Sequence, residues 1–115
     1  MKHFLSVNDV PDITALVKLA QRIKANPQSF SKVGEGKSLA MLFFNSSLRT
    51  RLSTDMAAAK LGMHRVSMNV HGDSWGLEFE EGAIMDGSTA EHIKEAASVI
   101  GNYADILAVR AFPSL

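Results

Sequence analysis

Hydroxyl and guanidinium side chains gather in one short run of this sequence. Residues 46–51 read Ser-Ser-Leu-Arg-Thr-Arg and follow the apolar segment 38–44 after a single asparagine. At a strand-to-helix junction, such a run places hydroxyl donors, backbone N–H groups and fixed positive charge where a helix dipole already favours an anion. The run therefore predicts a site for a phosphate group. The alternative is that one serine only caps the helix while both arginines lie in solvent.

The apolar periodicity around this run predicts three strands that alternate with helices. Crossover helices between strands require parallel pairing, so the expected fold class is α/β, a three-layer parallel sheet with flanking helices. The expected elements are helix 13–24, strand 38–44, helix 49–61, strand 65–70, helix 89–103 and strand 105–110, with Asp12 and Thr89 as candidate N-caps.

Three features are expected to meet beyond the carboxyl ends of these strands, where open parallel sheets bind their ligands. The run 46–51 follows the first strand, and Arg110 ends the third. The long loop 71–87 follows the second strand and holds the only tryptophan, Trp75. Trp75 either anchors its own loop or contacts a ligand or another subunit. With Arg110 at the same edge, a ligand site is favoured over simple helix capping.

Composition excludes several classes of function. Twelve Lys+Arg balance twelve Asp+Glu, so no overall field favours nucleic acid or an anionic membrane. The absence of cysteine excludes disulfides and thiolate metal sites, and the histidines show no metal-ligand spacing. No signal peptide and no apolar window of membrane-spanning length is present, so a cytoplasmic location is expected.

The segment 34–38, Gly-Glu-Gly-Lys-Ser, ends like a phosphate-binding P-loop but is interpreted as a turn. Residue 31, where the pattern needs its first glycine, is Ser31. A P-loop also follows a strand, whereas this segment precedes one.

Residues 47–51, Ser-Leu-Arg-Thr-Arg, resemble the carbamoyl-phosphate motif of the aspartate and ornithine carbamoyltransferases. Residues 97–110 are similar to a helix of that family and its arginine-terminated strand. Asn45 and Leu48 depart from the common motif. These two departures, together with residues 73–75 and 84–87, resemble the branch of the family that acts on N-succinylornithine or N-acetylornithine.

This resemblance implies a role for each residue of the run. Ser47, Arg49 and Thr50 would hold the phosphate, aided by the three backbone N–H groups of Leu48 to Thr50. Thr50 and Arg110 would also polarise the carbamoyl oxygen. No metal or organic cofactor is implied.

The resemblance also implies partners and a specificity position. Trp75 would reach into the site of a neighbouring subunit, which implies the family's homotrimer, while Arg51 would support the structure. At the position of Ala90, the acetyl-specific enzymes of the family resemble one another in having glutamate. The succinyl-specific enzymes resemble one another in having proline there. Since alanine has no carboxylate to repel a succinyl group, succinylornithine is the expected substrate.

The implied reaction is attack by the δ-amine of an N-acylornithine on carbamoyl phosphate, in arginine biosynthesis. Residues 1–115 would be the N-terminal part of the carbamoyl-phosphate-binding domain. The remainder of that domain, with its His-Pro-x-x-Gln segment, and an ornithine-binding domain would lie outside this chain. The chain alone is expected to bind an anion without turnover.

Two other interpretations suit the same α/β pattern. A receiver-like signalling domain needs acidic residues where the first strand here ends in serine and arginine. A phosphate- or sulfate-binding module without catalysis needs only the run itself.

Overall fold

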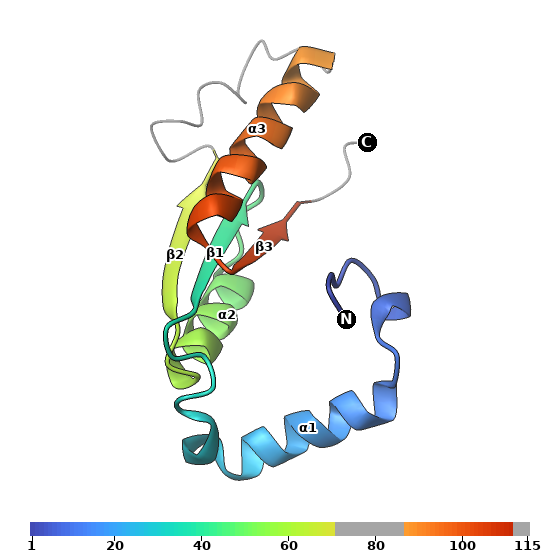
Figure 1. Ribbon diagram of the computed structural model, residues 1–115, viewed down its shortest axis with the longest axis vertical. Coiled ribbons are helices and arrows are strands. Elements are labelled where there is room, and N and C mark those ends of the chain that lie inside the picture. The colour runs from blue at the N-terminus through green and yellow to red at the C-terminus, as the bar shows by residue number, and fades with distance from the viewer. Residues whose placement is uncertain (71–86, 112–115) are drawn as a thin grey trace.

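A parallel three-stranded sheet forms the centre of the molecule (Figure 1). The computed structural model describes residues 1–70 and 87–111. Strand β1 (Ser38–Phe43) lies between β2 (His64–Asn69) and β3 (Ile106–Arg110), and both neighbours run parallel to it. The expected α/β class and parallel pairing are confirmed.

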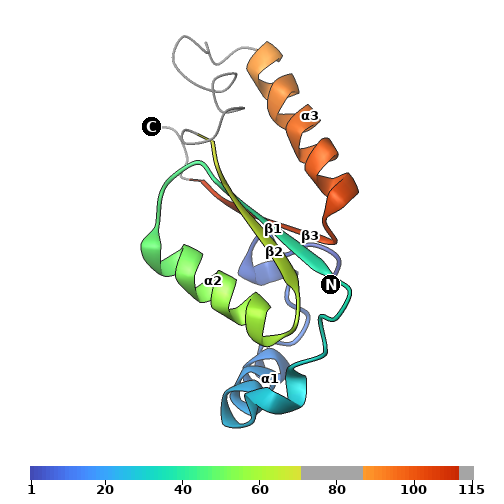
Figure 2. The ribbon, with the colours of Figure 1, turned by 90° about the vertical axis from the view of Figure 1, so that its left-hand side faces the viewer.

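Helices α2 (Leu48–Lys60) and α3 (Gly87–Tyr103) cover opposite faces of the sheet (Figure 2). The chain order explains this arrangement. The crossover through α2 leads from β1 outwards to β2, and the crossover through α3 leads back past β1 to β3. Since such crossovers are right-handed, reversing the direction moves the helix to the other face. The expected three layers are therefore present.

The core lies between β1 and α2. Five of the six β1 residues are buried, which confirms that this apolar run is covered on both faces. Ala58 provides the small side chain that lets α2 approach the sheet closely. The buried cluster consists of Leu39, Met41, Phe43 and Ala58, with Met63 and Ala108 packed against it.

The start of α2 and its end follow local signals in the sequence. Ser47 is the N-cap, and the helix ends at Lys60, just before Gly62. Gly62 has a φ of +81°, a left-handed conformation that glycine adopts without strain. An added Cβ there would also lie 2.5 Å from the Ser31 carbonyl oxygen. The helix therefore differs from its expected bounds by a single residue at each end.

The expected N-cap at Thr89 is wrong. Helix α3 begins at Gly87, so Thr89 lies inside its first turn. The side chains of residues 87–93 are outside the description, whereas Ala96, Ala97 and Ile100 are half-buried, as inward-facing residues should be.

Helix α1 (Ile13–Ala25) stands apart from the sheet (Figure 1). Asp12 caps it by accepting from the Ala15 amide at 3.0 Å, as expected, and the 3-10 helix η2 (Pro27–Phe30) follows it. None of its residues is buried. No helix among the described residues is long and apolar enough to cross a membrane.

A second capped turn precedes α1, the 3-10 helix η1 (Val7–Asp9). The Asp9 carboxylate accepts from the amides of Leu5 at 2.7 Å and Ser6 at 2.9 Å, and these hydrogen bonds lower the pKa of Asp9. The lowered pKa of Asp9 therefore reflects its role in the N-terminal turn. Asp9 is far in sequence from the run 46–51.

Candidate functional site

Ser47 organises the N-terminus of α2 at the carboxyl end of β1. Its Oγ accepts from the Thr50 amide at 3.2 Å, the usual hydrogen bond of a helix N-cap. The first N–H groups of the helix, those of Leu48 and Arg49, have no acceptor within the helix. Thr50 uses its own N–H for the cap, so the expected set of three backbone donors is reduced to two. The first turn carries no acidic residue, which leaves the positive end of the helix dipole open to an anion.

The hydroxyl of Thr50 is the centre of the site. Its Oγ1 accepts from Ser47 Oγ at 3.1 Å and from Arg110 Nη1 at 3.1 Å. A hydroxyl has two lone pairs and one proton. Since both lone pairs are engaged, the proton of Thr50 is the group that remains to be donated. Thr50 is thus arranged to donate a hydrogen bond beside a guanidinium.

The sheet register brings Arg110 to this point. Arg110 is paired with Phe43 at the carboxyl ends of β3 and β1, and the Phe44 amide donates to the Arg110 carbonyl at 2.9 Å. The side chain of Arg110 lies on the α2 face of the sheet, where it is half-buried and meets Thr50. Residues 60 positions apart in sequence therefore share one hydrogen bond.

The two arginines at the start of α2 are both exposed. The helix places successive residues about 100° apart, so Arg49 and Arg51 project about 200° from each other. Leu48 between the cap and Arg49 is 80% exposed and offers its backbone rather than its side chain to the site. The capping alternative is therefore confirmed in both of its parts, because Ser47 caps the helix and both arginines are exposed. The phosphate site stays a prediction, for which the contact of Thr50 with Arg110 provides suitable donors.

Sequence reasoning named Ser47, Thr50 and Arg110 but missed the hydrogen bonds that join them. The spacing of a serine three residues before a threonine at a helix start was the available signal for the first contact. No local signal marks the second, because it depends on the register of β3.

Two of the expected residues lie outside the described part of the chain. Trp75 belongs to residues 71–86, which are not described. Ala90 lies in the first half of α3, where the side chains are not described. Their expected roles stay predictions.

The site has no metal-binding character in the part of the chain that the structure describes. No group of three or more histidine, aspartate or glutamate residues there could hold a metal ion. The donors that do meet, hydroxyl and guanidinium groups, suit an oxyanion instead.

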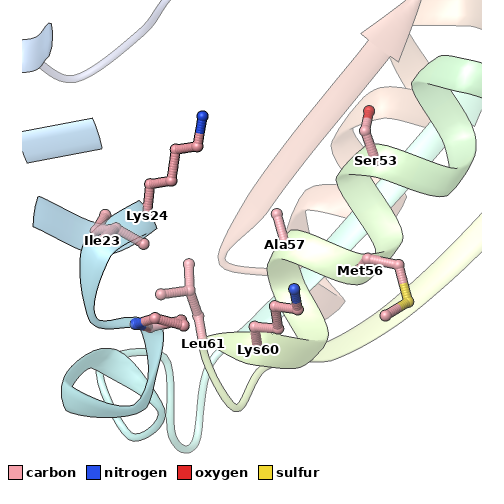
Figure 3. A pocket seen from close by; sticks show the side chains of 8 residues that line it. Ile23, Lys24, Ser53, Met56, Ala57, Lys60 and Leu61 are labelled. Atoms are coloured by element: carbon pink, nitrogen blue, oxygen red, sulfur yellow. The ribbon is translucent and has the colours of Figure 1, made fainter. Parts of the chain in front are cut away.

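A cavity of about 420 Å³ lies elsewhere, between the C-terminal parts of α1 and α2 (Figure 3). Its walls are mainly apolar, and it lies toward the end of α2 opposite to Ser47. It is therefore separate from the candidate site. The lining residues are Ile23, Lys24, Pro27, Ser53, Met56, Ala57, Lys60 and Leu61.

Comparison with known proteins gives relatives that match almost the whole chain. The chain is 45% identical over 112 residues to N-succinylornithine carbamoyltransferase of Bacteroides fragilis (strain 638R), covering 97% of this chain and 35% of that protein. It is 44% identical over 118 residues to N-acetylornithine carbamoyltransferase of Xanthomonas campestris pv. campestris, covering 98% and 33%. The chain thus spans about a third of the length of the curated relatives it matches.

Solved structures agree with these relatives. Variants of N-acetyl-L-ornithine transcarbamylase in which a glutamate is replaced by serine, valine or proline have been solved with carbamyl phosphate and N-succinyl-L-norvaline. Each is 43% identical to this chain, with a TM-score of 0.79, and the match covers 99% of this chain and 34% of the variant.

The model of one family covers almost the whole chain. Residues 2–115 match the family described as aspartate/ornithine carbamoyltransferase, carbamoyl-P binding domain. This match agrees with the parallel sheet between flanking helices. The chain therefore belongs to the aspartate/ornithine carbamoyltransferase family.

Proposed function

We propose that the whole protein transfers a carbamoyl group from carbamoyl phosphate to the δ-amine of an N-acylornithine, giving N-acylcitrulline and phosphate. The observation that carries this proposal is the contact of Arg110 with Thr50 beside the capped N-terminus of α2. It places two oxyanion donors next to a helix dipole at the ligand-binding edge of a parallel sheet. The named relatives act on acylornithines, which supports the choice of acceptor.

The residues of the site divide the work between the two ends of carbamoyl phosphate. Arg49 and the N–H groups of Leu48 and Arg49 bind the phosphate oxygens, and Thr50 and Arg110 donate to the nearest of these oxygens. The hydroxyl proton of Thr50 and the guanidinium of Arg110 also stabilise the carbamoyl oxygen as it gains negative charge. The amine nitrogen forms a bond to the carbamoyl carbon, the bond from that carbon to the phosphate oxygen breaks, and the amine proton leaves with the phosphate. Fixing both substrates in place supplies much of the acceleration.

Residues 1–115 form, in this proposal, the N-terminal part of the carbamoyl-phosphate-binding domain. Support comes from apolar surface on both faces of β3, where Ile106 is 51% exposed and Val109 is 55% exposed. Parallel sheets of this class normally have both faces covered. Further polypeptide of the kind that the longer relatives possess would cover them.

The proposed assembly is a cytoplasmic homotrimer in which Trp75 reaches the site of a neighbouring subunit. An apolar stripe on α2 supports an interface beside the site, since Leu48, Leu52 and Met56 lie four residues apart and are 80%, 56% and 46% exposed. A monomeric mass for the whole protein in solution would count against this assembly.

Succinylornithine is the proposed acceptor because Ala90 has no carboxylate to repel a succinyl group. The solved variants that have lost a glutamate are complexed with a succinylated norvaline, which supports this reasoning. In competition between acetylornithine and succinylornithine, the whole protein should consume the succinyl compound faster. A clear preference for acetylornithine would contradict the assignment of Ala90.

The chain itself should bind phosphate and carbamoyl phosphate without catalysing transfer. In an NMR titration, inorganic phosphate should shift the amide signals of Leu48, Arg49 and Arg110 saturably. Sodium chloride at the same ionic strength should not shift these signals saturably, because the chloride ion has no pair of oxygens to accept the two parallel hydrogen bonds of a guanidinium.

Two outcomes would contradict this function. Amide shifts that phosphate and chloride share would show a general salt effect and remove the anion site. Formation of a citrulline derivative by the 115-residue chain alone would show that the half-site suffices for catalysis.

A further inference from the structure

Ser38 and Asp105 are joined by reciprocal hydrogen bonds at the amino ends of β1 and β3. The Ser38 amide donates to Oδ2 of Asp105 at 2.9 Å, and the Ser38 hydroxyl lies 3.3 Å from the same oxygen and 3.3 Å from the Tyr103 carbonyl oxygen. The Asp105 amide is shared between the Ser38 carbonyl oxygen at 3.1 Å and Ser38 Oγ at 3.3 Å. We call this pair the Ser38–Asp105 clasp.

The clasp lies at the opposite end of the sheet from the candidate site. Strand β1 runs from Ser38 to Phe43, and at about 3.3 Å per residue these positions are about 16 Å apart. Neither residue of the clasp can therefore touch a ligand bound at Thr50. Any effect of the clasp on the site must pass along β1 or β3, the two strands that begin at it.

The side-chain pattern of β3 specifies its register poorly. Ile106–Val109 are four consecutive apolar residues, and the facing stretch of β1 is apolar throughout. When both faces of both strands are apolar, shifting one strand by a residue costs little in hydrophobic burial. Within the described residues β3 pairs with β1 alone, so the register needs another determinant. The clasp supplies specific polar contacts for one alignment only.

The position of Arg110 depends on that alignment. A slip of one residue would turn its side chain to the α3 face of the sheet. A slip of two would move it by about 7 Å and end its 3.1 Å contact with Thr50. We propose that Asp105 is a positioning residue, which sets the register of β3 on β1 and thereby holds Arg110 against Thr50. This inference rests on the proposed function, in which Arg110 binds the ligand.

The test compares Asp105→Ala with Asp105→Asn in the 115-residue chain. Asparagine keeps an acceptor for the Ser38 amide, whereas alanine removes it. The control is Asp55→Ala, which breaks the 2.6 Å ion pair with Arg65 between α2 and β2 and leaves β3 alone.

Two amides report on the two sides of β1. The Phe44 amide donates to Arg110 at 2.9 Å on the β3 side, and the Val70 amide donates to Phe43 at 3.0 Å on the β2 side. Asp105→Ala should speed hydrogen exchange of Phe44 about tenfold relative to Val70. It should also weaken inorganic phosphate binding about fivefold, as expected for the loss of one hydrogen bond. Asp105→Asn should restore both values to within about twofold, and Asp55→Ala should leave both unchanged.

The proposal is overturned if Phe44 and Val70 lose protection together, or if Asp105→Asn behaves like Asp105→Ala. If Asp105→Ala does not fold, Ser38→Ala removes only the hydroxyl contacts and should shift the same exchange ratio by a smaller factor. An unchanged ratio in that variant also overturns the proposal. If the unaltered chain binds no phosphate, the proposed function fails, while the exchange ratio still decides whether Asp105 sets the register.

Discussion

Arg49→Ala is expected to weaken the binding of inorganic phosphate about 100-fold, because a guanidinium that donates two charge-assisted hydrogen bonds to phosphate is lost. Arg49 is exposed in the first turn of α2, next to N–H groups without a helical acceptor. Its paired N–H donors match the oxygens of phosphate. The loss of affinity should therefore exceed the loss caused by removing a distant charge that makes no hydrogen bond to the phosphate. Isothermal titration at constant ionic strength measures the dissociation constant.

Arg51→Ala is the matched control for this variant. The substitution removes the same charge from the same exposed turn. The Arg51 side chain, however, projects about 200° around the helix axis from that of Arg49. At physiological salt the Debye length is about 8 Å, so the general field of either arginine is screened and Arg51→Ala should change affinity by less than about threefold. Equal losses in both variants would show that the site attracts anions only through its general field.

The elements with local signals agree with the sequence-based expectations. Helix α2 begins and ends within one residue of its expected bounds, since Ser47 and Gly62 mark its ends by capping and by a left-handed turn. The continuous apolar run of β1 correctly indicated a strand buried on both faces. The start of α3 was misjudged because Thr89 has a typical capping side chain but lies within a helix that begins at Gly87.

The features that escaped prediction depend on contacts between distant residues. The parallel topology placed Arg110 at the same sheet edge as the run 46–51, yet its hydrogen bond to Thr50 requires one particular register of β3. That register is accompanied by the contacts of Ser38 with Asp105, which lie 67 positions apart. The packing of α1 could not be predicted either. Its apolar periodicity predicts a helix but does not say against which element that helix packs. Ile13, Leu16 and Val17 are 46%, 42% and 49% exposed.

The hydroxyl of Thr50 can be tested without disturbing the helix around it. The cap of α2 uses the backbone N–H of residue 50, which donates to Ser47 Oγ at 3.2 Å whatever side chain is present. Valine has nearly the same shape as threonine but can neither accept from Arg110 nor donate to a ligand. Thr50→Val therefore removes the polar contacts of one atom while the cap and the packing are kept.

Thr50→Val is expected to weaken phosphate and carbamoyl phosphate binding about 100-fold, since the ligand loses a donor and the half-buried Arg110 guanidinium loses an acceptor 3.1 Å away. Thr50→Ser retains the hydroxyl and should stay within about threefold of the unaltered chain. The measurements are dissociation constants from titration, with circular dichroism to show that α2 is intact. If serine were as damaging as valine, the methyl group of Thr50 and not its hydroxyl would be what the site requires. If valine bound phosphate as well as threonine does, the contact between Arg110 and Thr50 would have no part in anion binding, and the observation that carries the proposed function would be lost.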